Sequence, residues 1–320
     1  MNRLEAMIAR QGDELERLSD TDVSAAADRL RGCSRVFLVG TGTSQHAAEL
    51  GASMLYDAVV DARACPSAAF GRGEVPVREG DGVIVISHTT ETAYARRSRD
   101  RAVAAGLPLV SITGRLGVWP EAVETVDREE SETYTVSYTG TLAALTLLAG
   151  ELGSATYTRE ALSGALPQVR AALRGNLHES VRLPARALAV VGAGPWGVTA
   201  REGALKLRES ARLLAEGFDA EYLLHGSAVP LTPADGLVLL EPSADPDGLV
   251  AALGEAATAE GIPVSTLALG DGLPPVLAQL PLTIVLQRLA AAWSALRGTD
   301  PDVAIVGGWA EPRLWELGAS

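Results

Sequence analysis

Short apolar runs alternate along the first half of the chain with longer segments of helical composition. The runs at 35–40 (RVFLVG), 82–87 (GVIVIS) and 107–112 (LPLVSI) are rich in β-branched residues and predict buried strands. Helices are predicted between them over 45–58 and 90–105, with Gly106 as the C-cap of the second. Strands that alternate with helices in this way predict βαβ units and a parallel sheet.

The same order of elements recurs in the second half. Strands are predicted at 187–192, 236–240 and 261–265, and Gly192 follows Gly40 by 152 residues. The other two strands recur at offsets of 152 and 155 residues, which indicates an internal duplication.

The predicted fold class is therefore α/β. It consists of two tandem doubly wound, flavodoxin-like modules, each a three-layer α/β/α sandwich around a parallel sheet. A helical arm over 1–32 precedes the first module, and a helical link over 153–185 joins the two. We place the domain boundary near residue 165, which gives 1–165 as the arm plus the first module. Residues 166–320 are the second module plus a C-terminal tail.

Composition narrows the function classes. The formal net charge of −13 disfavours nucleic-acid binding, although helix N-termini and hydroxyl groups can still hold an anionic ligand. Cys33 and Cys65 form no disulfide framework, and no Cys/His spacing typical of a metal site is present. No apolar run has the length of a membrane span, and the charged residues 1–20 do not resemble a signal peptide. We therefore expect a cytoplasmic protein with no metal and no membrane partner.

Two hydroxyl-rich turns each follow a predicted strand and precede a predicted helix. The first is GTGTS at 40–44, with Thr43 and Ser44, and the second is SHTTET at 87–92. In an open α/β sheet both turns lie outside the carboxyl ends of the strands, where ligands bind, and backbone N–H groups at a helix start suit a phosphate. The alternative is an ordinary capped βα turn, with His88 incidental.

A third pattern places acidic and basic groups on one helical face. Glu202, Lys206 and Glu209 stand at i, i+4 and i+7, and Lys206 is the only lysine in the chain. Two carboxylates beside an amine suit proton transfer, because neighbouring charges tune the pKa of the base. The alternative is a solvated ladder of ion pairs on a helix surface.

Two further features leave alternatives open. His225 precedes Gly226 in a predicted loop and could reach a substrate, although a structural histidine is the commoner case. Gly192–Gly197 (GAGPWG) fits the G-x-G-x-x-G pattern of dinucleotide sites. Such a site expects an acidic residue at the end of the next strand, and the acids at that spacing, Glu209 and Glu216, fall in what the pattern predicts as one continuous helix. We therefore expect no nicotinamide cofactor.

Together these motifs resemble the sugar isomerase (SIS) family in a double-SIS arrangement. The closest likeness is to the isomerase domain of glutamine–fructose-6-phosphate aminotransferase (glucosamine-6-phosphate synthase) without its glutaminase domain, and the likeness to amino-sugar-phosphate deaminases and deglycases is looser. GTGTS and SHTTET resemble the two phosphate loops of the family. The run EGALKLRESARLLAEGFDAEYLLHGSAVPL at 202–231 resembles its most specific signature.

The resemblance implies a role for each matching residue. The residues implied to line the phosphate and sugar pocket are Thr43, Ser44, Ser87, His88, Thr89 and Thr92. Glu209 would move a proton between C1 and C2 of the sugar, with Glu202 and Lys206 beside it. His225 would assist ring opening from the neighbouring subunit, which implies a homodimer with shared sites.

This chain also departs from the family pattern. Thr89-Thr90 replaces a Ser-Gly pair in the second loop, and the position of the family's imine-forming tail lysine falls near Trp309. The expected function is that of an isomerase or deaminase acting on an amino-sugar phosphate or a sugar-phosphate amine adduct, without a cofactor. The alternatives are a non-catalytic sugar-phosphate-binding regulatory protein and, on the glycine pattern alone, a dehydrogenase.

Overall fold

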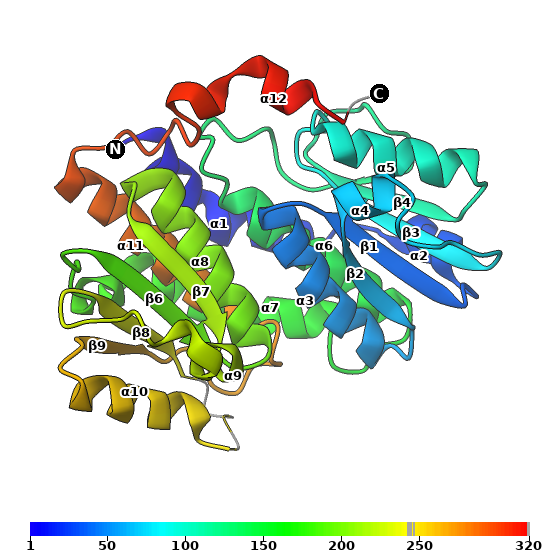
Figure 1. The fold of residues 1–320 in the computed structure, drawn as a ribbon. Coiled ribbons are helices and arrows are strands. Elements are labelled where there is room, and N and C mark those ends of the chain that lie inside the picture. The colour runs from blue at the N-terminus through cyan, green and yellow to red at the C-terminus, as the bar shows by residue number, and fades with distance from the viewer. Residues whose placement is uncertain (242–244, 246, 319–320) are drawn as a thin grey trace. The chain divides into compact units, whose positions relative to one another are not determined.

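The computed structural model describes residues 1–241, 245 and 247–318, which form two compact units, each with its own sheet (Figure 1). The N-terminal unit comprises Asp13–Glu129, Tyr134–Gly164 and the chain from Ile305 onward. The C-terminal unit comprises Met1–Gly12, Glu130–Thr133 and Ala165–Ala304. The division of the sequence into two domains at residue 165 stays a prediction.

The N-terminal unit is built on a five-stranded parallel sheet in the order β2-β1-β3-β4-β5. Its strands are β1 (Arg35–Gly40), β2 (Ala62–Pro66), β3 (Asp81–Ile86), β4 (Leu109–Thr113) and β5 (Ala122–Glu124). Its helices are α2 (Ser24–Leu30), α3 (Thr43–Asp57), α4 (Ser67–Gly71), α5 (Ala93–Ala104) and α6 (Val136–Glu151). The three predicted strands are confirmed, and β2 and β5 are additional edge strands too short and polar to be recognised from the pattern.

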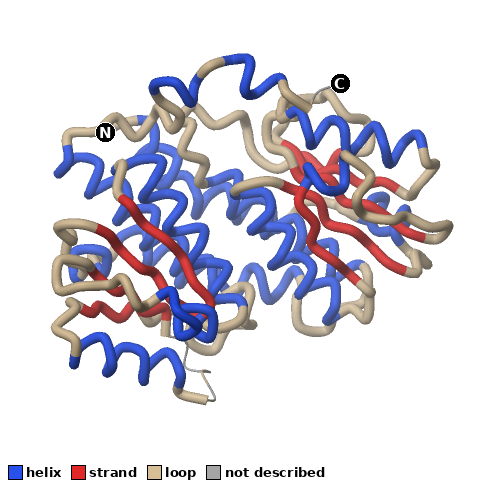
Figure 2. The backbone as a smooth tube through the Cα atoms, viewed as in Figure 1, coloured by secondary structure: helices blue, strands red, loops and turns tan. Residues whose placement is uncertain are grey.

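Helices cover both faces of this sheet, and alternate strand residues supply each core layer (Figure 2). Phe37 and Val85 point to one face, where they pack with Phe70 of α4 and with α5. Leu38 points to the other face, where it and Leu145 of α6 lie against Gly51 of α3. This alternation is the period of two expected for a strand buried on both faces.

The C-terminal unit repeats the arrangement with four parallel strands in the order β7-β6-β8-β9. Its strands are β6 (Ala187–Gly192), β7 (Leu214–Asp219), β8 (Gly236–Leu240) and β9 (Val264–Leu267). Helix α10 (Leu249–Ala259) packs on one face through Val250 and Leu253. Helices α8 (Pro195–Ala211) and α11 (Gln279–Arg297) pack against each other, and α8 packs on β6 and β7. The predicted fold class, two doubly wound α/β/α modules with parallel sheets, is confirmed.

The remaining helical segments complete the description. They are α1 (Arg3–Ser19), α7 (Arg159–Arg174), η1 (Leu177–Ser180), α9 (Ala220–Tyr222), η2 (Leu223–Ser227), η3 (Gly307–Ala310) and α12 (Pro312–Glu316). The predicted arm is thus two helices, α1 and α2, and the predicted link contains α7.

One predicted element is wrong. The continuous helix expected from residue 202 through 216 ends at Ala211, and β7 begins at Leu214. Arg212, in the left-handed conformation (φ 51°), caps α8 and turns the chain. Strand β7 then pairs along its whole length with β6, and Gly217 lets it lie against α8, because a Cβ there would be 2.3 Å from the Arg201 backbone. Pairing with β6 therefore overrides the helical composition of this segment.

Candidate functional site

The two hydroxyl-rich turns lie at the switch point of the N-terminal sheet. Strands β1 and β3 are neighbours, and the chain order reverses between them, because β2 lies outside β1 and β4 lies outside β3. The turns that follow β1 and β3 leave the carboxyl ends of adjacent strands, which is where open α/β sheets bind ligands. The structure thus brings the two predicted phosphate turns to the same edge of one sheet.

The first turn, at residues 40–44, is tight because two of its positions require glycine. Gly42 has φ 55° and ψ −129°, and a Cβ on Gly40 would lie 2.4 Å from the backbone carbon of Ser44. The Ser44 N–H donates to the Thr41 carbonyl at 3.1 Å, at the start of the 15-residue helix α3. Thr43 and Ser44 are half-buried in the first helical turn. The turn therefore sets two hydroxyl groups beside the positive end of a helix dipole.

The second turn contains a buried hydroxyl group with no partner. Ser87 is 3% exposed, its N–H donates to the Ile112 carbonyl, and its Oγ bonds to none of the described residues. Thr89 and Thr92 are half-buried in the same turn. Because a buried polar group without a partner is costly, the Ser87 hydroxyl is available to a hydrogen-bond partner from outside the described residues.

Thr90 occupies the left-handed region in this turn, with φ 60°. This conformation favours glycine, which is the residue that the family carries at this position. The Thr90 hydroxyl donates to the Thr89 carbonyl at 2.6 Å. The turn thus keeps the backbone of a glycine-containing loop with a strained, β-branched residue in the glycine position.

His88 is held in a neutral form by its surroundings. Its Nε2 accepts a hydrogen bond from the Glu129 N–H at 3.0 Å, and its ring meets the Tyr134 ring edge-on at 5.5 Å between centroids. Burial lowers the pKa of His88, so the imidazole is uncharged at neutral pH. Nε2 is therefore not a donor for a phosphate, and only Nδ1 carries a proton.

Glu129 was not recognised in the sequence. Its buried carboxylate accepts hydrogen bonds from the N–H groups of Thr135 and Ser137 and from the Thr135 hydroxyl, at 2.8–3.0 Å. It thereby caps the N-terminus of α6, where a negative charge is stabilised. The sequence gives no local signal for this, because the carboxylate reaches over six residues, whereas a typical cap reaches over two or three.

In the C-terminal unit, Glu202, Lys206 and Glu209 form one charged cluster on α8. Lys206 Nζ lies 2.8 Å from Glu209 Oε2 and 3.4 Å from Glu202 Oε1. The side chains of Lys206 and Glu202 are 0% exposed, and that of Glu209 is 18% exposed. The alternative of a solvated surface ladder is therefore wrong: α8 buries this face.

Burial raises the pKa of Glu209 above its usual range, and the charge of Lys206 opposes that shift. Glu202 adds to the rise, because a second carboxylate nearby disfavours another negative charge. A carboxylate whose pKa lies above the usual range and whose oxygen is still partly exposed suits general-base catalysis near neutral pH.

A short segment from the first half of the sequence, Glu130–Thr133, belongs to the same unit as this cluster. Arg212 donates to the carbonyl groups of Glu209 and Val303, and at 2.8 Å to that of Ala304. The Ala304 N–H in turn donates to Glu132 Oε2 at 2.9 Å. Glu132 thus lies within the same unit as Glu209 and is tied to the segment that Arg212 holds, a placement that sequence separation conceals.

His225 does not meet Glu209 within one chain. Its side chain is 73% exposed and lies 3.8 Å from Glu221. Asp219, at the end of β7, lies beside Gly197 near the start of α8, whereas Glu209 is twelve residues further along that helix, about 18 Å away at 1.5 Å per residue. His225 follows β7 and therefore lies at the opposite end of α8 from Glu209.

The turn after β6 matches a dinucleotide-binding site more closely in the structure than in the sequence pattern. Because β7 is a strand, Asp219 ends it directly beside Gly192, the position of the acidic residue in dinucleotide sites. Gly194 (φ 57°, ψ −125°) also repeats the conformation of Gly42. However, Asp219 Oδ2 accepts the Gly194 N–H at 3.3 Å. The chain's own carboxylate thus takes a backbone donor that a phosphate would use.

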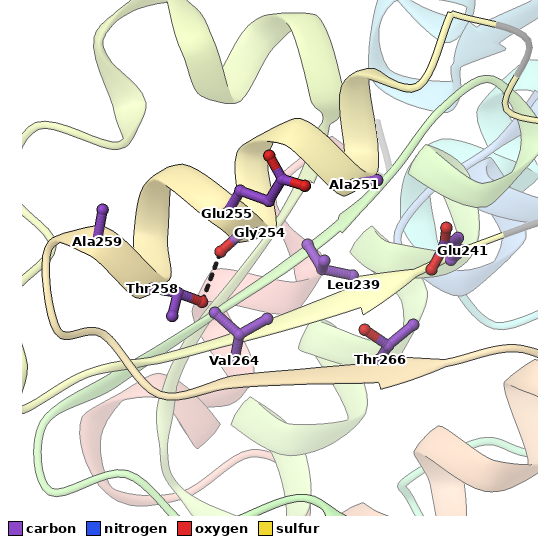
Figure 3. Close-up of a pocket in the computed structure, with 9 residues that line it drawn as sticks. All are labelled: Leu239, Glu241, Ala251, Gly254, Glu255, Thr258, Ala259, Val264 and Thr266. Atoms are coloured by element: carbon purple, nitrogen blue, oxygen red, sulfur yellow. Dashed lines mark hydrogen bonds between the residues drawn. The ribbon is translucent and has the colours of Figure 1, made fainter.

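A separate hollow lies between α10 and strands β8 and β9 (Figure 3). The residues that line it are Leu239, Glu241, Ala251, Gly254, Glu255, Thr258, Ala259, Val264 and Thr266. None of the predicted site residues is among them, and its two carboxylates disfavour an anionic sugar phosphate.

The described part of the chain shows neither a cluster of metal-ligating side chains nor a helix that could span a membrane. Among residues 1–241, 245 and 247–318, no group of three or more His, Cys, Asp or Glu side chains is placed to hold a metal ion. None of the helices over this range combines the length and the apolar character needed to cross a bilayer.

The fold is that of a two-module α/β protein, and comparisons with known proteins confirm the resemblance stated from the sequence. The chain is 27% identical over 318 residues to the glutamine–fructose-6-phosphate aminotransferase of Thermococcus kodakarensis, covering 88% of this chain and 52% of the relative. The Pyrococcus horikoshii protein of the same name is 26% identical. The chain thus spans about half the length of the curated relatives it matches, and no family model matches it.

Solved structures share the fold over almost the whole chain. Tagatose-6-phosphate ketose/aldose isomerase from Escherichia coli gives a TM-score of 0.80 at 18% identity, covering 97% of both chains. The C-terminal domain of glucosamine-fructose-6-phosphate aminotransferase from Francisella tularensis gives 0.78 at 19% identity, covering 95% of this chain and 98% of that domain. Glucosamine-6-phosphate deaminase from Thermotoga maritima gives 0.76 at 18% identity, covering 94% and 97%.

Proposed function

We propose that this chain is a sugar-phosphate enzyme, an isomerase or deaminase that acts on an amino-sugar phosphate or a sugar-phosphate amine adduct. The observation that carries the proposal is the buried Glu202–Lys206–Glu209 cluster, with a raised pKa at Glu209. The names of the similar proteins, which include isomerases, an aminotransferase and a deaminase of sugar phosphates, support the same substrate class.

The two turns of the N-terminal unit are proposed to bind the phosphate. Thr43 and Ser44 would donate hydroxyl hydrogen bonds beside the N-terminus of α3, and Ser87 would donate its unpaired hydroxyl. Thr89 and Thr92 would complete the set, and His88 would position the turn through its bond with Glu129. A dianionic phosphate suits hydroxyl donors at a helix N-terminus.

Glu209 is proposed to move the proton. Its carboxylate takes the C2 proton of an aldose while the C1 carbonyl oxygen gains a proton, which gives a neutral enediol. Return of the proton from Glu209 to C1, with loss of the hydroxyl proton at C2, gives the ketose. Lys206 would hold the carboxylate in position, and activity should rise with pH through the raised pKa of Glu209, because only the ionised form accepts a proton.

His225 is proposed to act on a neighbouring subunit in a homodimer. Within one chain it is exposed and lies far along α8 from Glu209, so a role beside that carboxylate requires a second copy. Mixing Glu209→Gln with His225→Asn chains tests this role. Heterodimers would carry one intact site, so activity should return to about a quarter of wild type if sites are shared. Two inactive variants that stay inactive after mixing would contradict sharing.

Proton exchange in deuterated water tests the enzyme proposal. Hexose 6-phosphates, their 2-amino forms and fructosamine-type 6-phosphates are first screened by thermal shift, and each compound that binds is followed by NMR. We expect the C2 proton of a bound ligand to exchange with wild type and to be retained with Glu209→Gln, while affinity is unchanged. Exchange that survives Glu209→Gln would remove Glu209 from its role.

The second candidate is a non-catalytic sugar-phosphate-binding regulatory protein. The observation that favours it is Trp309, which stands near the position of the tail lysine of the resembling family. Tight binding of a sugar phosphate with neither exchange nor conversion would support this candidate.

A further inference from the structure

Four buried polar atoms without partners lie on the two helices that pack together in the C-terminal unit. They are Nε1 of Trp196 and Oγ1 of Thr199 on α8, and Oε1 of Gln279 and Oγ1 of Thr283 on α11. All four side chains are more than nine-tenths buried, and none of these atoms bonds to another described residue. Buried polar atoms of this kind are rare, so four on one helix pair require an explanation.

The contacts between the two helices show on which side of each helix the four atoms stand. A Cβ on Gly203 would lie 2.5 Å from Leu286, and Ser210 donates to the Ala290 carbonyl, so α8 and α11 run in the same direction with these residues facing the partner helix. Trp196 and Gln279 each precede the Gly203–Leu286 contact by seven residues, about 10.5 Å along the axis.

Thr199 and Thr283 lie between these residues and the Gly203–Leu286 contact. Thr199 precedes Gly203 by four residues, about 6 Å, and Thr283 precedes Leu286 by three, about 4.5 Å. In both helices these spacings keep the side chains on the face that carries the contact. All four side chains therefore stand on the facing sides of α8 and α11, N-terminal to the Gly203–Leu286 contact.

Local helix geometry does not account for the unpaired hydroxyl groups. A buried threonine in a helix commonly donates to the carbonyl four residues earlier, and Thr141 and Thr146 of α6 do so at 2.8 Å. Thr199 and Thr283 make no such bond. Their hydroxyl groups are therefore available to a partner at the interface.

The four groups have complementary chemistry but make no hydrogen bond with one another. Trp196 only donates, whereas Gln279 Oε1 only accepts, because the amide nitrogen of Gln279 already donates to the Pro275 carbonyl at 2.7 Å. The two threonine hydroxyl groups can each donate or accept a hydrogen bond. A small neutral molecule that both donates and accepts would satisfy all four, and water is the molecule that proteins bind in such places.

We infer that a buried water cluster occupies the interface between α8 and α11 and bonds Trp196, Thr199, Gln279 and Thr283. Thr199 stands one turn before Glu202 and two turns before Lys206 on the same side of α8. The cluster thus extends the polar face of α8 toward the buried Glu202–Lys206 pair and would supply it with water. This second role rests on the proposed function, whereas the water cluster itself does not.

The sign of a stability change tests the water cluster. The double variant Thr199→Val/Thr283→Val removes two partners of the water, so we expect the melting temperature to fall by about 2–4 °C. In a dry interface each hydroxyl group is an uncompensated cost, so the same variant would melt higher, and that result would overturn the inference. Thr258→Val is the control for the substitution itself, because Thr258 is exposed and its hydroxyl donates to the Gly254 carbonyl in the same unit.

Direct observation gives a second test. In protein labelled at tryptophan nitrogen, the Trp196 indole proton, assigned with Trp196→Phe, should show a cross-relaxation peak with water. A high-resolution crystal structure should show ordered water within 3.2 Å of Trp196 Nε1. Direct bonds among the four side chains, with no water between them, would refute the inference.

The pH profile of C2 proton exchange tests the link to the Glu202–Lys206 pair. The double valine variant should shift this profile, whereas Thr258→Val should not. An unmoved profile in a variant that has lost its water would refute the link and leave the cluster standing. A wild-type protein without exchange activity would refute only the proposed function.

Discussion

Replacing Lys206 by methionine is the most informative perturbation of the charged cluster. Lys206 and Glu202 are both 0% exposed, and the amine lies 3.4 Å from one carboxylate and 2.8 Å from the other. The methionine keeps the length of the side chain but leaves Glu202 buried without its counter-charge. Loss of one partner of a buried ion pair typically costs about 3–5 kcal/mol.

The assay is urea unfolding followed by circular dichroism, with thermal melts alongside. A cost of this size lowers the melting temperature by on the order of 10 °C in a domain of this length. The control is Arg63→Met, because Arg63 pairs with Asp61 at 2.9 Å with both side chains about half exposed. Such a surface pair is screened by water, so the control should melt with wild type.

A second variant separates lost charge pairing from lost packing. Glu202→Gln combined with Lys206→Met removes both charges of the fully buried pair, so most of the stability should return. A Lys206→Met protein within about 1 kcal/mol of wild type would refute the reasoning, because it would mean that Glu202 reaches solvent or is already protonated.

Three further variants test single features of the structure. Thr90→Gly should raise the melting temperature, because it relieves a left-handed threonine that costs on the order of 1–2 kcal/mol; a lower value would show that the Thr90 hydroxyl bond outweighs the strain. Ser87→Ala should weaken phosphate binding in calorimetry about tenfold without loss of stability, because its hydroxyl bonds to no described residue. The control is Ser98→Ala, which removes a hydroxyl that donates to the Ser67 and Tyr94 carbonyls. This variant should lose stability and keep its affinity for phosphate. Asp235→Asn should destabilise the protein at neutral pH, because Arg186 and Thr232 lower the pKa of Asp235 to about 2. Since that pKa is lowered, the contribution of Asp235 is complete above pH 4 and is lost as the pH falls toward 2, so melting curves of the two proteins should converge there.

The apolar pattern of the sequence is enough to predict the architecture and the position of the candidate turns. Five of the six predicted strands are recognisable because strands covered on both faces are continuous apolar runs, whereas β9 is mostly half-buried or exposed. The turns after β1 and β3 followed from the same pattern, because the hydroxyl residues stand directly between a strand and a helix. The alignment of Glu202, Lys206 and Glu209 on one face followed from helical periodicity alone.

Long-range packing controls which of those helix faces and segments are buried. Periodicity shows that three charged side chains share a face of α8, but only packing against neighbouring elements shows that Lys206 is buried. The segment 214–219 has a helical neighbour and a mixed composition, and its pairing with β6 made it a strand that ends in Asp219. The bond between Glu129 and His88 joins residues 41 positions apart, and that bond, with burial, decides the charge of the imidazole. Local sequence sets what each segment can form, whereas burial and long-range hydrogen bonds set the charge state and exposure that chemistry depends on.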